Sequence, residues 1–210
     1  MDLEAFLQIR FAFIRQFYDG ATASFSSKLS LIEQRQPPFD TYPEGFNPED
    51  GEPPYLEECL EALESVELIG NVCLELVQKA LKQFLDSFLK EIGHTLPPVE
   101  KGQGKDGWLG RYRRFFWEKF DVDLSDSGAD LAVIEQIVLA RNDLQHEGSL
   151  MYTFTAPTKH HMSKYPDSSF VKGRGFFSTI SVTREALLNA IDTVSLLCSW
   201  LEKQRCPHRI

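Results

Sequence analysis

The chain has 210 residues, 42% of them hydrophobic and 25% charged, and a formal net charge of −9 at pH 7. This length and composition suit one globular domain, with or without an elaborated insert. The negative charge argues against a protein that coats nucleic acid without specificity. Residues 1–100 carry 7 Lys/Arg and 18 Asp/Glu, whereas residues 101–210 carry 15 and 13, so a polyanion would meet the second half.

Hydropathy and cysteine usage indicate a cytoplasmic protein with no membrane partner. No segment approaches the length of a transmembrane helix, and residues 1–4 lack the basic start of a signal peptide. The four cysteines, Cys59, Cys73, Cys198 and Cys206, show no metal-like pairing, so we expect reduced thiols. We expect no cofactor and no metal.

The first predicted helix spans residues 3–35, unless it breaks at Gly20. Three aromatic residues, Phe6, Phe13 and Phe17, keep one face apolar. The face can extend through Phe25, Leu29 and Ile32. Aromatic density of this kind usually means core packing against a partner helix, with a ligand pocket as the alternative.

A proline-rich loop over residues 36–54 separates this helix from the longest helical pattern, at residues 55–92. Gly70 lies in the apolar stripe of that pattern, where a neighbouring helix could approach closely. The stripe consists of Leu56, Leu60, Leu63, Cys73, Val77, Phe84 and Phe88. Glutamates cover the early turns, between residues 57 and 67, and we expect them to form a solvated face.

After a Gly- and Pro-containing connection over residues 93–107, a shorter helix is predicted at residues 108–120. It carries Arg111, Arg113 and Arg114 among aromatic residues, a combination that can hold phosphates and stack bases. In the alternative, the arginines only face water and the aromatic side chains are buried, namely Tyr112, Phe116 and Phe120.

The next helix is predicted to begin at a capping box, Ser127-Gly-Ala-Asp130, and to end by Gly148. One of its faces carries Leu131, Ile134, Val138 and Arg141. Arg141 therefore continues a core-facing stripe toward the end of the helix.

Residues 150–182 have the composition of an insert, with β-branched and aromatic residues at 151–155 and 176–182. The segment between them is basic and contains Lys159, Lys172 and Arg174. It also contains His160-His161, which we expect to be structural or solvent-facing, because adjacent histidines rarely chelate one ion and no acidic partner is spaced with them.

Thr183 caps a final helix that ends near Arg205. Its core stripe consists of Leu187, Ile191, Val194, Cys198 and Leu201. The sequence therefore predicts a single all-α domain over residues 1–210, an up-down bundle of about five helices. A small β-hairpin or irregular insert, at about 150–182, precedes the last helix.

The strongest chemical signal is the stretch Arg-Asn-Asp-Leu-Gln-His-Glu-Gly at residues 141–148. Arg141 is always charged, His146 can exchange a proton near neutral pH, and Asn142 adds a polar side chain. Together they form a compact set of groups for attack on a phosphodiester.

This motif, at a helix end in an up-down bundle, resembles the HEPN superfamily (higher eukaryote and prokaryote nucleotide-binding domains). The family signature is Arg, four to six residues, then His, often with a polar residue after the Arg. The resemblance covers about eight residues and a helical architecture of suitable size. It implies a metal-independent RNA endonuclease, typically dimeric, whose two motifs face each other across the subunit interface. Such enzymes commonly act as toxins, with an antitoxin partner, or in defence against phage.

By this resemblance, His146 would deprotonate the ribose 2′-OH or protonate the leaving 5′-oxygen, two copies supplying one base and one acid. Arg141 would stabilise charge on the pentavalent phosphate. Asn142 would orient the phosphate or the histidine. The products would be a 2′,3′-cyclic phosphate and a 5′-hydroxyl. Relatives that a nucleotidyltransferase modifies carry Tyr two residues after the His, where this chain has Gly148, so we do not expect that regulation.

Five positions along an ideal helix place Arg141 and His146 about 140° apart. They converge only if the helix ends or bends near residues 144–146, or if they meet across a dimer. In the non-catalytic alternative, Arg141 pairs with Asp143, Glu147 or a carboxylate of another helix, and His146 interacts only with the helix end.

Two functional hypotheses follow. The first is an endoribonuclease with Arg141, Asn142 and His146 in catalysis and with basic side chains that contact RNA: Arg111, Arg113, Arg114, Lys159, Lys172 and Arg174. The second is a catalytically inactive HEPN-like module that binds a nucleotide or a protein partner, with the acidic helix at residues 57–67 as its interaction face.

Overall fold

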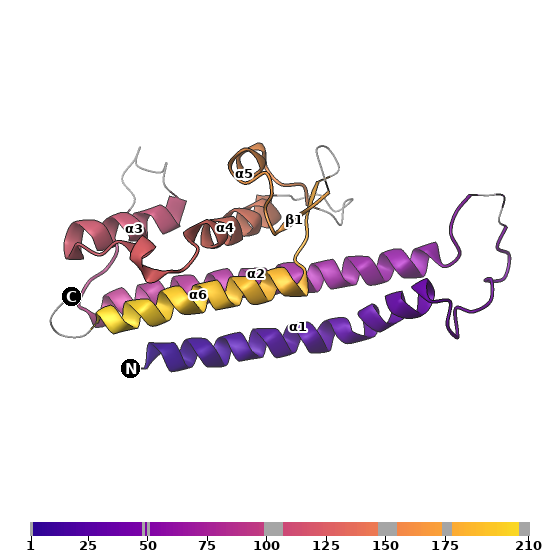
Figure 1. Ribbon diagram of the computed structural model, residues 1–210, viewed down its shortest axis with the longest axis horizontal. Helices are drawn as coiled ribbons and strands as arrows, with labels where there is room; N and C mark the ends of the chain where they lie inside the picture. The colour runs from indigo at the N-terminus through magenta and orange to yellow at the C-terminus, as the bar shows by residue number, and fades with distance from the viewer. Residues whose placement is uncertain are drawn as a thin grey trace.

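The computed structural model describes residues 2–47, 49, 51–98, 107–146, 155–173 and 178–205, without the side chain of His146. Three long helices, α1 (Leu3–Glu33), α2 (Leu56–Glu91) and α6 (Arg184–Gln204), pack side by side (Figure 1). On the side of α2 and α6 away from α1 lie α3 (Gly107–Phe120) and α4 (Leu131–His146), arranged end to end (Figure 1). The predicted all-α bundle is confirmed.

Helix α1 continues unbroken through Gly20, but it buries a different face from the one predicted. Its core-facing residues are Leu3, Leu7, Phe11, Ile14, Tyr18 and Thr22. The predicted core residues Phe6, Phe13 and Phe17 are instead 61%, 58% and 38% exposed. Because α2 and α6 both contact the Phe11 side of the helix, the second apolar face is left toward solvent.

A groove of about 610 Å³ runs between this exposed face and α2. Its walls are mainly apolar and come from Leu3, Phe6, Leu7, Ile9, Arg10, Phe13, Ala80, Gln83, Phe84 and Ser87. The exposed face of α1 is therefore apolar, and α1 lies on the opposite side of α2 and α6 from α4 (Figure 1).

Helix α2 is the centre of the bundle and contacts α1, α4 and α6. Cys73, Val77, Phe84 and Phe88 are buried as predicted, whereas Leu60 and Leu63, near its N-terminus, are exposed. The close approach expected at Gly70 is present, although the neighbour is backbone preceding α6 rather than another helix. A Cβ atom at Gly70 would lie 2.6 Å from the carbonyl oxygen of Val182.

The last helix follows the sequence prediction closely. The Thr183 hydroxyl accepts a hydrogen bond from the Ala186 backbone N–H at 3.2 Å, which caps α6. The five stripe residues are at most 1% exposed: Leu187, Ile191, Val194, Cys198 and Leu201. None of the helices in the described ranges is long and apolar enough to cross a membrane.

The insert before α6 contains the short helix α5 (Lys159–Lys164), which the sequence analysis did not predict, and two short strands. β1 (Val171–Lys172) and β2 (Thr179–Ile180) pair antiparallel, with Val171 opposite Ile180. β2 falls in the second predicted β segment, whereas residues 151–154 of the first lie outside the described residues. Thr155 of that first segment accepts a hydrogen bond from the Ile180 N–H at 2.7 Å.

Candidate functional site

The motif lies on α4, whose start differs by a few residues from the prediction. Asp130, not Ser127, caps the helix, since its Oδ1 accepts from the N–H groups of Ala132 and Val133 at 2.9 and 3.3 Å. Ser127 instead ends a 3₁₀ turn, Leu124–Ser127, and its hydroxyl donates to the Leu124 carbonyl. Local hydrogen bonds of Ser127 and Asp130 thus hold the chain between the end of α3 and the start of α4.

The last turns of α4 present the motif residues on different sides of the helix. Arg141 is half-buried, and its Nη1 lies 3.3 Å from Oδ1 of Asn142, to which it donates. α4 remains helical through His146, whose side chain lies outside the described residues, as does Glu147. The helix therefore does not end before His146, and positions 141 and 146 of an ideal helix lie about 140° apart around its axis.

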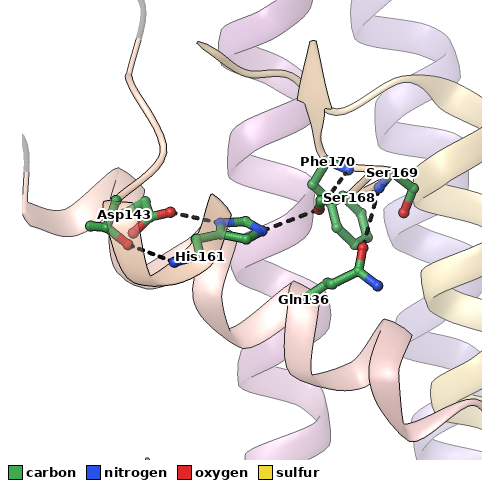
Figure 2. Close-up of polar contacts among 7 residues, drawn as sticks. Gln136, Asp143, His161, Ser168, Ser169 and Phe170 are labelled. Carbon is green, nitrogen blue, oxygen red and sulfur yellow. Dashed lines mark hydrogen bonds and ion pairs between the residues drawn. The ribbon is translucent and has the colours of Figure 1, made fainter. Parts of the chain in front are cut away.

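Asp143, inside the motif, belongs to a buried polar network with the insert. Its Oδ2 lies 2.7 Å from Nδ1 of His161, and Nε2 of His161 lies 3.1 Å from Oγ of Ser168 (Figure 2). His161 is fully buried, and Asp143 and Ser168 are 3% and 6% exposed. The order Asp–His–Ser matches the connectivity of a hydrolytic triad. Because all three side chains are buried, a substrate cannot reach the Ser168 hydroxyl. We therefore interpret the network as structural.

Two further hydrogen bonds extend this network to the β-strands. The Ser168 hydroxyl oxygen accepts from the Phe170 N–H at 3.3 Å, and Oε1 of Gln136 accepts from the Ser169 N–H at 3.2 Å (Figure 2). The network thus joins α4, α5 and the approach to β1. Asp143, expected to pair with Arg141 in the non-catalytic alternative, is instead engaged by His161. The sequence analysis found no acidic partner for His160-His161, and the structure shows that Asp143 is the partner of His161.

A second, partly exposed contact holds α5 against α4. Glu135 pairs with Lys164 and accepts a hydrogen bond from the Tyr165 hydroxyl at 2.6 Å. Burial alone would raise the pKa of Glu135, but these two donors outweigh it and lower the pKa. The pKa of Tyr165 is raised, first by burial and then by its bond to Glu135. At neutral pH the contact therefore holds an ionised carboxylate and a neutral phenol.

One open groove borders the motif, between α3, α4 and α5. It has a volume of about 540 Å³, and we call it the α3–α4 groove. It is lined by Gly107, Trp108, Leu109, Gly110, Arg113, Arg114, Trp117, Asp123, Leu131, Glu135, Val138, Leu139, Asn142, His160 and Lys164. Basic and aromatic side chains thus share one concave surface with a residue of the motif, Asn142.

The predicted RNA contacts divide into two groups. Arg113 and Arg114 are exposed and line the α3–α4 groove together with Asn142. Arg111 lies elsewhere, because its guanidinium donates to the backbone carbonyl of Pro97. Of the remaining three, Lys159 begins α5, Lys172 lies on β1 near Glu67, and Arg174 is outside the described residues.

Four further residues line the groove: Trp108, Trp117, His160 and Lys164. Trp117 lies among the aromatic residues of the helix predicted to stack bases, and His160 and Lys164 lie in the basic insert predicted to contact RNA, but no individual role was predicted for them. Trp108 was not predicted to form part of a site. The available signal was the spacing of Arg113 and Trp117, one helical turn apart on the same face of α3. The buried aromatic face of the same helix is confirmed in Tyr112 and Phe116, which are 1% and 0% exposed, while Phe120 is only partly buried.

No group of three or more His, Cys, Asp or Glu side chains that could hold a metal ion occurs in the described part of the chain. Comparison with protein-family models, with curated proteins and with solved structures gave no match to this chain.

Proposed function

We propose that the protein is an endoribonuclease of the HEPN type, acting in the cytoplasm without a metal ion, with Arg141 and His146 as its catalytic pair. His146 exchanges protons with the 2′-oxygen or the 5′-oxygen, and Arg141 stabilises the charge that develops on the phosphate. The 2′-oxygen attacks phosphorus, the bond from phosphorus to the 5′-oxygen breaks, and the 2′ proton passes to the base while an acid protonates the leaving oxygen.

The observation that carries this proposal is the position of Asn142. It follows Arg141 directly, receives a hydrogen bond from it, and lines the groove that also contains Arg113 and Arg114. The residue expected to orient the phosphate thus lies on the same surface as two arginines, which are suited to bind a polyanion. The excess of positive charge in residues 101–210 favours the same surface.

The unbroken end of α4 supports an active site made by two copies. Because α4 is helical through His146, positions 141 and 146 of one copy lie on different sides of the helix axis. A pair of copies joined near the ends of their α4 helices would bring Arg141 of one copy to His146 of the other. Such a homodimer also supplies the two histidines that one base and one acid require.

The test is a cleavage assay on total RNA and on tRNA in excess EDTA, with wild type, His146→Ala and Arg141→Ala. We expect wild type to cleave and to leave 2′,3′-cyclic phosphate and 5′-hydroxyl ends. Both variants should lose cleavage, by at least about a hundredfold for the histidine.

His94→Ala is the matched control, since His94 is exposed and packs against Phe115 and Phe120 of α3 rather than lining the groove. It should cleave like wild type. Cleavage that persists in folded His146→Ala protein, or that EDTA abolishes, would contradict the proposal. Mixing inactive Arg141→Ala with inactive His146→Ala should restore part of the activity if the site is shared between copies.

A further inference from the structure

The α3–α4 groove contains a tryptophan that is exposed for no evident structural reason. Trp117 is 56% exposed on α3 and lines the groove, whereas the neighbouring Phe115 and Phe116 are buried. Trp117 lies four residues after Arg113, so both project from one face of the helix. A large aromatic side chain with one open face, beside a cation, is the arrangement in which single-stranded nucleic acid is bound.

Two hydrogen-bond donors in the same groove have no acceptor among the described residues. Arg113 is exposed and makes no hydrogen bond or ion pair with any residue in the described ranges; its long-range electrostatic effect reaches Asp123, Glu135 and Tyr165. The indole Nε1 of Trp108, another lining residue, is buried and has no partner among the described residues. A buried donor without an acceptor is unfavourable, and an acceptor on a bound ligand would remove that cost.

Three other charged groups of the groove are already engaged. Lys164 pairs with Glu135, and Asp123 accepts a hydrogen bond from the Ser125 N–H at 2.9 Å. Arg113, which has no such contact within the described ranges, is placed to receive a phosphate. The groove volume of about 540 Å³ lies within the range of small-ligand sites.

We infer that the α3–α4 groove binds one nucleotide of an unpaired RNA segment, with its base stacked on Trp117 and its phosphate on Arg113. The inference rests on the proposed function for the identity of the polymer. It adds that the substrate is single-stranded at this position, since a base held in a duplex cannot stack on a protein side chain. Asn142 then receives the adjoining backbone of the same strand at the motif.

Binding can be measured apart from cleavage in a His146→Ala background, by fluorescence anisotropy of a short labelled RNA, single-stranded or annealed to its complement. We expect the single strand to bind at least about tenfold more tightly than the duplex. Trp117→Ala should weaken single-strand binding about tenfold or more, and Trp117→Phe, which keeps an aromatic face, much less. Arg113→Gln should lower the slope of log affinity against log salt concentration by about 0.7, as for one lost phosphate contact.

Phe13→Ala is the matched control, because Phe13 is an aromatic residue of nearly the same exposure, 58%, on α1 and outside the groove. It should bind RNA like the parent protein. Equal affinity for duplex and single strand would overturn the inference, as would equal behaviour of Trp117→Ala and Phe13→Ala.

The outcomes for the groove and for the catalytic pair are separable. Trp117-dependent binding of single strands by a wild-type protein that cleaves nothing would support the groove and contradict the nuclease. If wild type cleaves RNA but substitution of Trp117 or Arg113 leaves single-strand binding unchanged, the nuclease is supported and the groove is contradicted.

Discussion

His161 and Asp143 face each other across 2.7 Å, between Nδ1 and Oδ2, with 0% and 3% of their side chains exposed. One belongs to α5 and the other to the turn of α4 that carries Arg141 and Asn142. The pair therefore connects the insert to the end of α4, where catalysis is proposed. Loss of the pair should destabilise both the insert and that end of the helix.

Removing the imidazole should be strongly destabilising. His161→Ala leaves the Asp143 carboxylate buried without a partner, and we expect a loss of about 3–5 kcal/mol in the free energy of unfolding. Lys164→Ala, which removes a partly exposed ion pair between the same two helices, should cost about 1 kcal/mol or less. Urea denaturation followed by circular dichroism would compare them. Equal losses would show that the buried pair is not what holds α5. In the His161→Ala background, Asp143→Ala should cost less than it does alone.

Two glycines in long helices should respond in opposite directions to alanine. Gly70→Ala places a methyl group 2.6 Å from the Val182 carbonyl oxygen, so α2 and the chain before α6 must separate, at a cost of about 1–3 kcal/mol. Gly20→Ala meets nothing within 4 Å and should stabilise α1 by about 0.5–1 kcal/mol. Thermal unfolding of both variants measures the difference, and a stabilised Gly70→Ala protein would contradict the packing described here.

The two aromatic faces of α1 provide a further contrast. Phe11 is fully buried and Phe13, two residues later, is 58% exposed. Phe11→Ala should lower the free energy of unfolding by about 3–5 kcal/mol through loss of core packing. Phe13→Ala should change it by about 0.5 kcal/mol or less. If urea denaturation ranks them the other way, α1 is rotated about its axis in solution relative to the arrangement in which Phe11 is buried.

The sequence predicted elements whose signals are local and failed where the deciding contact is distant. Thr183 and the stripe through Leu201 predict α6 because the cap and the helical period lie within the helix itself. α1 has two apolar faces at helical spacing, and only the positions of α2 and α6 decide that Phe11 is buried and Phe13 is not. Periodicity alone cannot choose between two such faces.

The same limit applies to the candidate site. The motif at residues 141–148 could be identified from its residue types, but the contacts that its side chains make with the insert could not. Asp143 and His161 are separated by 18 positions in the sequence, so no spacing rule links them. For α5, the local signal was Thr158, whose hydroxyl accepts from the His161 N–H at 3.3 Å and caps the helix. In a short, basic segment that signal is weak.

The thiols should differ sharply in reactivity. Burial raises the pKa of Cys73 to about 11 and that of Cys198 well above its ordinary value, so both remain protonated near neutral pH. Cys59 is half-buried and should react first with a maleimide or with a disulfide reagent. A Cys206→Ser background restricts the comparison to the three described thiols. Rapid labelling of Cys73 in the folded protein would contradict its burial.

The raised pKa of Cys73 also predicts a pH dependence of stability. Folding favours the protonated thiol, so this contribution is complete below the ordinary pKa near 9.0 and is lost as pH rises through about 11. The urea midpoint should fall over that interval, and Cys73→Ala should fall less steeply. Identical slopes for the two proteins would mean that other groups govern stability in alkali.

The open apolar face of α1 affects how the folding of this protein should be followed. Dyes such as ANS fluoresce on exposed apolar surface and are commonly used to detect partly folded states. Here the native chain already presents Phe6, Ile9 and Phe13 beside a groove of about 610 Å³. The native protein should therefore bind the dye, and a fluorescent signal would not indicate loosened packing. Only loss of near-ultraviolet circular dichroism would distinguish a molten chain from an intact one.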